Sequence, residues 1–260
     1  MNETHVIVYP NESLLAQAVA ARLIARLAEV QASKGGVGLV LAGGSVAVAS
    51  LAAVGQSPAR DAVDWAAVDL WWGDERYLPA GDPERNETQA RRALLDALPL
   101  QRSRVHPMPA AESEVGQDVP LSGVDDAAAD YAAELARHAP GGQKLPEFDV
   151  LLLGVGPEGH TASIFPESPA VYEQRPVAAV HGCPKPPPQR ITLTLPAIRT
   201  ADEVWLLAAG KAKAGAISMA LQGAGEVQIP AAGTTGRTRT LWLLDQTAAA
   251  EVPAELRTPW

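Results

Sequence analysis

One histidine and one carboxylate lie together in a glycine-rich stretch of the chain. Residues 154–163 read Gly-Val-Gly-Pro-Glu-Gly-His-Thr-Ala-Ser, which places Glu158 two residues before His160. An imidazole has an unperturbed pKa of about 6.5, so it can take and return a proton at neutral pH. We therefore expect His160 to act as a general base and acid, with Glu158 beside it. The alternative is a buried structural histidine or a partner of a helix N-terminus.

The other histidines lack such a setting, and no two histidines in the sequence lie three or four residues apart. Zinc sites commonly use paired ligands at helical spacing or clusters of cysteines. The chain has a single cysteine, so neither pattern is present. We expect no metal site. The remaining histidines are His5, His106, His138 and His181.

A second stretch, Gly43-Gly44-Ser45, follows the apolar residues 37–42. Glycine lets a backbone approach a ligand closely, and the free N–H groups at a helix N-terminus attract anions such as phosphate. The Ser45 hydroxyl adds a donor. We expect these three residues to bind an anion, although a plain strand-to-helix turn with a serine cap has the same sequence. The lysine of a Walker A loop and the third glycine of a dinucleotide fingerprint are missing.

Charged residues follow other apolar stretches. Asp74, Glu75 and Arg76 come directly after 66–72 and Gly73. Arg76 can hold a phosphate or carboxylate in a fork, and Asp74 or Glu75 can orient it. A solvated, salt-bridged turn is the alternative.

Further basic residues stand at two more of these positions. Arg190 begins an apolar stretch, and Lys211 and Lys213, two of the five lysines, follow residues 203–208. Any one of these residues alone could be a solvated charge on the surface. Because they all stand at the ends of predicted strands, together they favour an anion site.

The elements that position these residues alternate between short apolar runs and helical stretches. Continuous apolar strands are typical of strands buried on both faces, and their alternation with helices predicts an α/β fold with an open, mostly parallel sheet flanked by helices on both faces. In such sheets, ligands bind outside the carboxyl ends of the strands. We expect strands at 5–9, 37–42, 66–72, 148–153, 190–195, 203–208 and 240–244, and helices from Asn11 or Ser13 to 32 and at 45–54, 86–97, 125–138 and 212–222.

Two polar segments interrupt this alternation without a change of composition around them. We interpret 109–125 and 184–189 as surface loops of one domain that spans residues 1–260, and we expect the proline-rich second loop to be extended polyproline II.

Composition narrows the class of protein. The chain has 260 residues, 47% hydrophobic and 20% charged, which excludes general disorder. A formal net charge of −9 argues against nucleic acid or an anionic membrane as partner, but not against a small anionic substrate. With no apolar run of about 18 residues and no secretion signal, we expect a cytoplasmic protein. The sequence does not give the oligomeric state.

Four motifs, taken in order, resemble those of the 6-phosphogluconolactonases. They read VLAGGS, WWGDERYLP, FDVLLLGVGPEGHTASIFP and RITLTLPAI, and a G-x-x-K follows the next strand. The resemblance covers almost the whole chain. It implies the Rossmann-like α/β fold that is shared with the glucosamine-6-phosphate deaminases. It also implies hydrolysis of 6-phospho-D-glucono-1,5-lactone to 6-phosphogluconate in the oxidative pentose phosphate pathway, without metal or cofactor.

The resemblance also implies roles for individual residues. His160 matches the catalytic histidine, and Arg76 and Asp74 match the charged block. The match departs from the family pattern at Val46, where a threonine is common, and at Glu158, where an aspartate is usual. The expected phosphate-binding residues are Gly43, Gly44, Ser45, Arg190 and Lys213.

Three other functions each need a sequence feature that this chain lacks. A glucosamine-6-phosphate deaminase carries an acidic residue five places after its histidine and a tyrosine in its charged block, whereas this chain has Phe165 and Arg76. A sugar-phosphate sensor would need a DNA-binding module, and none is evident before the first glycine stretch. A serine hydrolase would need a G-x-S-x-G elbow, which is absent, and Ser163 follows His160 closely.

Overall fold

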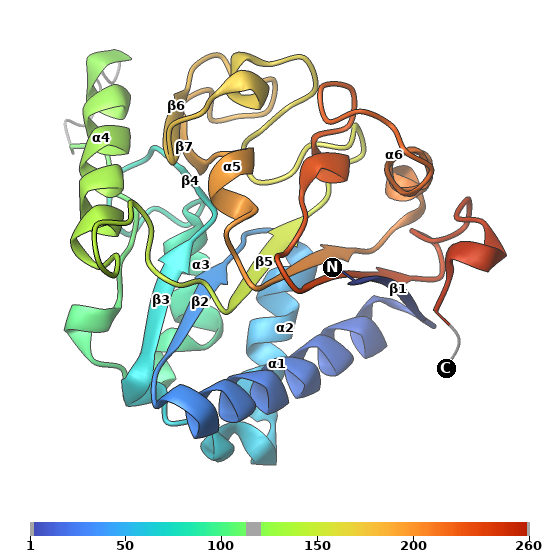
Figure 1. Cartoon of the computed structure of the whole chain (residues 1–260), viewed down its shortest axis with the longest axis horizontal. Coiled ribbons are helices and arrows are strands. Elements are labelled where there is room, and N and C mark those ends of the chain that lie inside the picture. The colour runs from blue at the N-terminus through green and yellow to red at the C-terminus, as the bar shows by residue number, and fades with distance from the viewer. Residues whose placement is uncertain (1–2, 113–120, 259–260) are drawn as a thin grey trace.

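The computed structural model describes residues 3–112 and 121–258. Within these residues the centre is a six-stranded sheet in the order β1-β9-β8-β5-β2-β3, in which every neighbouring pair is parallel. The mostly parallel α/β sheet is therefore confirmed. Strands β1 and β9 lie side by side at one edge (Figure 1). The strands are β1 (Glu3–Tyr9), β2 (Val37–Leu41), β3 (Val68–Trp72), β5 (Val150–Gly154), β8 (Glu203–Ala208) and β9 (Arg239–Asp245).

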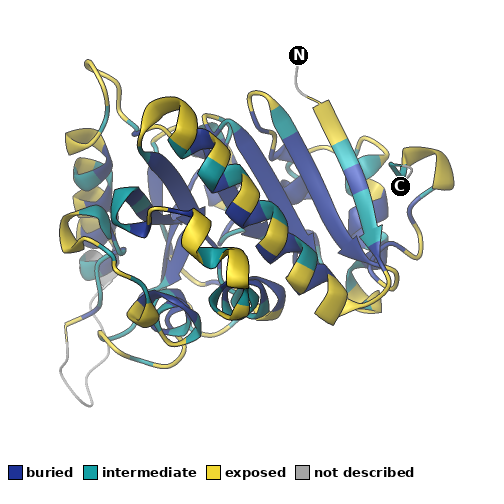
Figure 2. Cartoon of the chain, turned by 90° about the horizontal axis from the view of Figure 1, so that it is seen from below, coloured by how far each residue is buried: buried dark blue, intermediate teal, exposed yellow. Residues whose placement is uncertain are grey.

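Helices α1 (Glu12–Lys34) and α2 (Ser45–Gln56) pack against each other and against one face of this sheet (Figure 2). The Asn11 side chain caps α1 by accepting from the Leu14 N–H at 2.9 Å, as expected. Strands β2 and β8 are buried along their whole length, which is why their sequences are continuous apolar runs. The buried stripe of α1, with spacings of three and four residues, includes Leu15, Val19, Leu23, Leu27 and Val30.

A second sheet, which the sequence did not reveal, is antiparallel and has the order β4-β7-β6. Its strands are β4 (Asp74–Arg76), β6 (Val177–Val180) and β7 (Arg190–Leu193). The charged residues after the strand at 66–72 do not form the salt-bridged turn, because the chain leaves the main sheet at Gly73 and pairs as β4 with β7. The expected strand at 190–195 exists, but it belongs to this second sheet.

The remaining helices are α3 (Asn86–Ala93), α4 (Leu121–Arg137), α5 (Leu195–Ile198) and α6 (Ala214–Leu221). Helix α3 ends earlier than expected, and α4 begins inside the expected loop at 109–125, of which residues 113–120 lie outside the described residues. The second sheet, α5 and α6 lie on the opposite side of the main sheet from α1 and α2, and α4 packs against β6 and β7 (Figure 1). Among the described residues, no helix combines the length and the apolar character that a membrane crossing requires.

Candidate active site

A cleft of about 340 Å³ opens at the carboxyl ends of β2, β3 and β5. This is the edge at which ligands bind in open α/β sheets. Ser45 and Glu158 do not line the cleft, because Ser45 is exposed at the start of α2 and Glu158 is paired with His160 and Lys185. The other residues expected from the sequence do line it: Gly43, Gly44, Asp74, Arg76, His160, Arg190 and Lys213.

The tight loop after β5 fixes the position of His160. The Gly156 N–H donates to the His160 carbonyl at 2.9 Å, and the Gly159 N–H donates to the Gly156 carbonyl at 3.0 Å. Gly159 has a φ of +88°, a conformation that glycine adopts without strain. A Cβ atom at position 156 would lie 1.9 Å from His160 Nδ1, so the ring packs directly on this glycine. The imidazole also stacks on Phe165, with the ring centroids 4.3 Å apart.

A carboxylate lies next to one nitrogen of the His160 ring. Nδ1 is 3.2 Å from Glu158 Oε2, and Lys185 Nζ is 2.9 Å from Glu158 Oε1. Burial by itself would raise the pKa of Glu158, but the hydrogen bond from Lys185 and other favourable contacts lower it overall. Burial lowers the pKa of His160, although the Glu158 carboxylate acts in the opposite direction.

These shifts leave His160 neutral at physiological pH. A proton on Nδ1, facing Glu158, makes Nε2 the basic nitrogen. No residue in the described part of the chain forms a hydrogen bond with Nε2. The arrangement can therefore accept a proton from a molecule in the cleft.

Asp74 is held rigidly and does not orient Arg76. Its Oδ2 accepts from the Ser163 hydroxyl at 2.6 Å, and its Oδ1 accepts from Asn86 Nδ2 at 3.3 Å. The side chain of Asn86 packs so closely on the loop after β2 that a Cβ at Gly43 would lie 2.0 Å from Asn86 Oδ1. The Asp74 carboxylate thus links three segments of the cleft wall.

Glu75 was expected to orient the Arg76 side chain, but its carboxylate binds backbone N–H groups instead. Its carboxylate accepts N–H bonds from Arg76, Asn86 and Glu87 at 2.7–2.9 Å, which fastens β4 to the start of α3. Arg85 Nη2 lies 3.7 Å from its Oε2. Burial raises the pKa of Glu75 to about 7, against the opposing effects of Arg85 and these N–H groups.

The guanidinium of Arg76 is oriented by Glu84 instead. Arg76 Nη1 donates to the Glu84 backbone carbonyl, and the Glu84 carboxylate lies 3.8 Å away. The expectation that Asp74 or Glu75 orients Arg76 is wrong, because both carboxylates are used by other donors. Arg76 lines the cleft.

The loop after β2 offers backbone donors. Helix α2 starts at Ser45, and its N-terminus has no side-chain cap. Gly44 has a φ of +95°, so glycine is needed there. The uncapped N–H groups and the helix dipole favour an anion at this end of the cleft.

Arg190 is buried and organises the proline-rich loop. Its Nε donates to the Pro187 carbonyl at 3.3 Å, and its Nη2 donates to the carbonyls of Lys185 and Pro186 at 3.1 and 3.0 Å. Three successive carbonyls that converge on one side chain are incompatible with extended polyproline II, so that expectation for 184–189 is wrong. Arg190 Nη1 has no hydrogen-bond partner among the described residues, and Arg190 lines the cleft.

Arg76 and Arg190 are direct partners across the β4–β7 pair. Side chains of residues that lie opposite each other share one face of a sheet, and like charges in such a position are destabilising. Both guanidiniums line the same cleft. An anion between them would remove this repulsion.

Lys213 adds a further cation, whereas Lys211 does not. Lys213 lines the cleft, and burial lowers its pKa, with a smaller contribution from Lys185. Lys211 is exposed and is not among the residues that line the cleft.

Sequence reasoning missed Lys185 and Asn86, which both line the cleft. Lys185 stands in the proline-rich loop and is one of only five lysines, which was an available signal. Asn86 had no such signal, because its contact with Asp74 depends on how β4 meets α3.

Comparison with known proteins assigns the chain to a family. A family model described as glucosamine-6-phosphate isomerases/6-phosphogluconolactonase matches residues 10–242. The 6-phosphogluconolactonase of Streptomyces coelicolor is 56% identical over 267 aligned positions, which cover 100% of this chain and 99% of that protein. The Mycobacterium tuberculosis 6-phosphogluconolactonase is 47% identical over 248 positions, with 95% and 98% covered.

A solved structure agrees with this assignment. The 6-phosphogluconolactonase from Trypanosoma brucei superposes with a TM-score of 0.85 at 25% identity, over 97% of this chain and 100% of that one. The chain therefore belongs to the 6-phosphogluconolactonases, within the wider family that also holds the glucosamine-6-phosphate isomerases.

Proposed function

We propose that this protein is a 6-phosphogluconolactonase, which hydrolyses 6-phospho-D-glucono-1,5-lactone to 6-phospho-D-gluconate in the oxidative pentose phosphate pathway. The observation that carries the proposal is one cleft that holds both a neutral histidine with an unbonded Nε2 and the opposed Arg76–Arg190 pair. A lactone with a phosphate needs both, because water must lose a proton and the phosphate must be neutralised. The names of the relatives support the choice of substrate.

His160 acts as the base in this reaction. Its Nε2 takes a proton from water as the water oxygen bonds to C1 of the lactone. The bond between C1 and the ring oxygen then breaks, and His160 returns the proton to the ring oxygen. Positioned proton transfer of this kind contributes about 10²–10⁴ in rate. Glu158 keeps the proton on Nδ1, so that Nε2 stays available.

The negative charge that develops on the C1 oxygen needs a donor in the cleft. Arg76 is one candidate, and a backbone N–H of the glycine-rich loop after β5 is the other. One such donor contributes roughly 3 kcal/mol of transition-state stabilisation. A δ-lactone is an activated ester, so these groups suffice without a covalent nucleophile.

The phosphate is held away from the reacting carbon. The uncapped start of α2 at Gly43 and Gly44, together with Arg190 and Lys213, provides N–H groups and positive charge. Binding energy at the phosphate holds the lactone close to the water and the base. Lys185, which also lines the cleft, adds a further cation.

We also propose that the reaction needs no metal ion and takes place in the cytoplasm. His160 and the cations already supply proton transfer and charge stabilisation. The substrate is a charged sugar phosphate, which does not cross a lipid bilayer unaided. Turnover should therefore be unchanged after treatment with a chelator.

The direct test adds purified protein to freshly generated lactone and follows its disappearance against the spontaneous rate. We expect acceleration by the wild type and a loss of about 10²–10⁴ in kcat for His160→Gln, with the fold retained. His181→Gln, at an exposed histidine outside the cleft, is the matched control and should keep full activity. Near-full activity of His160→Gln would remove this residue from the mechanism.

A wild type that does not accelerate hydrolysis would refute the proposed function. Two measurements then identify the alternative. Release of ammonia from glucosamine 6-phosphate would indicate a deaminase. Tight binding of 6-phosphogluconate without turnover would indicate a sensor.

A further inference from the structure

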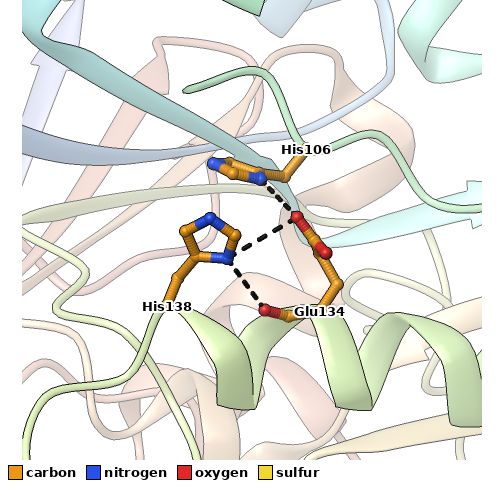
Figure 3. Close-up of side chains that lie close together, drawn as sticks. All are labelled: His106, Glu134 and His138. Atoms are coloured by element: carbon orange, nitrogen blue, oxygen red, sulfur yellow. Dashed lines mark hydrogen bonds and ion pairs between the residues drawn. The ribbon is translucent and has the colours of Figure 1, made fainter. Parts of the chain in front are cut away.

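His106, Glu134 and His138 converge at a place away from the catalytic cleft, and none of them lines that cleft (Figure 3). His106 donates its backbone N–H to the Leu70 carbonyl of β3 at 2.9 Å. Glu134 lies in the last turn of α4, and His138 directly follows that helix. One nitrogen of each imidazole and one carboxylate oxygen lie within 4.8 Å of one another.

The distances within this cluster are close to those of a metal site. His106 Nδ1 lies 2.7 Å from Glu134 Oε1, and His138 Nδ1 lies 3.6 Å from the same oxygen. A tetrahedral zinc ion with ligand bonds of about 2.0–2.1 Å separates its ligand atoms by about 3.3 Å. The two observed distances lie on either side of that value, so small side-chain movements would admit the ion.

The surroundings of the two ring nitrogens of His106 give an independent reason to expect a cation at this cluster. His106 is 4% exposed, and its ring stacks on Trp71 with the ring centroids 3.9 Å apart. Nδ1 faces Glu134, whereas Nε2 is buried without a hydrogen bond and lies 3.7 Å from Asp69 Oδ1. A neutral imidazole has one N–H, so one of its nitrogens then presents a lone pair to a carboxylate.

A metal ion on Nδ1 removes this conflict. The single proton then sits on Nε2 and points toward Asp69. Histidines that bind metals commonly donate their second N–H to a carboxylate in this way.

Two neighbouring arginines leave one oxygen of Glu134 and one oxygen of Asp69 facing the histidines. Arg137 Nη2 lies 2.6 Å from Glu134 Oε2, and Arg104 Nη1 lies 2.7 Å from Asp69 Oδ2. Each arginine thus takes the outer oxygen of its carboxylate, and the inner oxygen faces the histidines. The His138 side chain is 38% exposed, which gives an ion access, and its Nδ1 must release the Glu134 backbone carbonyl at 3.0 Å.

We propose that His106 Nδ1, Glu134 Oε1 and His138 Nδ1 bind one zinc ion, with water as the fourth ligand. Two imidazoles and one carboxylate suit zinc, whereas magnesium and calcium prefer oxygen ligands throughout. Such an ion ties the end of α4 to His106, whose backbone is hydrogen-bonded to the edge strand β3, and takes no part in lactone hydrolysis. The expectation of no metal site rested on the absence of histidine pairs and of cysteine clusters. It left out a set in which Glu134 and His138, four residues apart, combine with His106, which is distant in sequence.

The test is equilibrium dialysis of the untagged, chelator-treated protein against zinc, with metal content measured per chain. We expect one zinc ion per wild-type chain. In a parallel dialysis against magnesium, we expect no magnesium ion to bind with comparable affinity. Loss of an outer-shell partner alone weakens metal binding about 10–100-fold, so the loss of a direct ligand in His138→Ala or Glu134→Gln should weaken zinc binding by at least that much. His181→Ala is the matched control, because His181 is similarly exposed, at 40%, and pairs with Asp125 outside the cluster.

Thermal unfolding provides a second readout that does not depend on catalysis. A ligand that binds only the native state stabilises it, so zinc should raise the Tm of the wild type and of His181→Ala, but not that of His138→Ala. The proposal is wrong if the wild type binds no zinc. It is equally wrong if both cluster variants bind zinc as tightly as the wild type.

Discussion

The substitution Glu158→Gln tests how the pKa of the catalytic base is set. Glu158 and His160 are 3.2 Å apart, and the carboxylate raises a pKa that burial lowers. Glutamine keeps the size of the side chain but removes its charge. The pKa of His160 should therefore fall further in this variant.

The size of the effect follows from the distance. Two unit charges 3.2 Å apart interact by about 2.6 kcal/mol at an effective dielectric constant of about 40, and by about 1.3 kcal/mol at about 80. Glu158 is 35% exposed and also pairs with Lys185 at 2.9 Å, so solvent and the lysine both reduce its effect. The lower value applies, and it corresponds to a change of about tenfold in the affinity of His160 for a proton.

The assay is the pH dependence of kcat/KM, corrected for spontaneous hydrolysis. Only neutral His160 accepts a proton, so activity rises with pH through its pKa. A lower pKa moves this acid limb toward lower pH, and the weaker base reduces the plateau by up to about tenfold.

Replacement of Lys185 is the counterpart, because the positive charge of Lys185 lowers the pKa of His160. Lys185→Gln should move the acid limb toward higher pH. If the limb of Glu158→Gln stays in place or moves upward, Glu158 does not control the base, and our account of the pair fails.

Three further changes address the positions of other groups. Gly156→Ala puts a Cβ 1.9 Å from the His160 ring, and because a misplacement of about 1 Å can cost about 10²-fold, kcat should fall toward that extent while circular dichroism stays unchanged. Arg190→Lys keeps the charge but loses the fork on the loop carbonyls, so KM should rise about tenfold, and an unchanged KM would contradict this role. Tyr131→Phe removes the hydroxyl that accepts the Trp72 N–H at 3.0 Å, so urea unfolding should show a loss of about 1–3 kcal/mol.

The part of the site that lies on the main sheet could be predicted from the sequence. Continuous apolar runs gave the positions of β2 and β5, and glycines directly after them marked the loops at the working edge. Gly156 is needed because the His160 ring packs on it, and Gly159 is needed because its φ is positive. Both requirements appear in the sequence as glycines around His160. In this part of the site, the residues that follow each strand in the sequence are also the ones that line the cleft.

The part that lies on the second sheet could not be predicted. Strand β4 has three residues, all charged, and shows no apolar pattern, so only its pairing with β7 makes it a strand. The partners of Arg76, Asp74 and Arg190 depend on long-range contacts that no spacing reveals. For the same reason the sequence could not show that Arg76 and Arg190 lie opposite each other.

Division of the site between two sheets raises the question of what keeps the base and the cations at a fixed separation. His160 comes from the loop after β5, whereas Arg76 and Arg190 come from β4 and β7. The buried hydrogen bond of 2.6 Å from the Ser163 hydroxyl to Asp74 joins these two parts directly. Asp74 is only 7% exposed and both its oxygens accept hydrogen bonds, so we infer that it positions the site. The net charge of −9 is then compatible with an anionic substrate, because the second sheet presents its guanidiniums to the cleft and this bond holds them against the base.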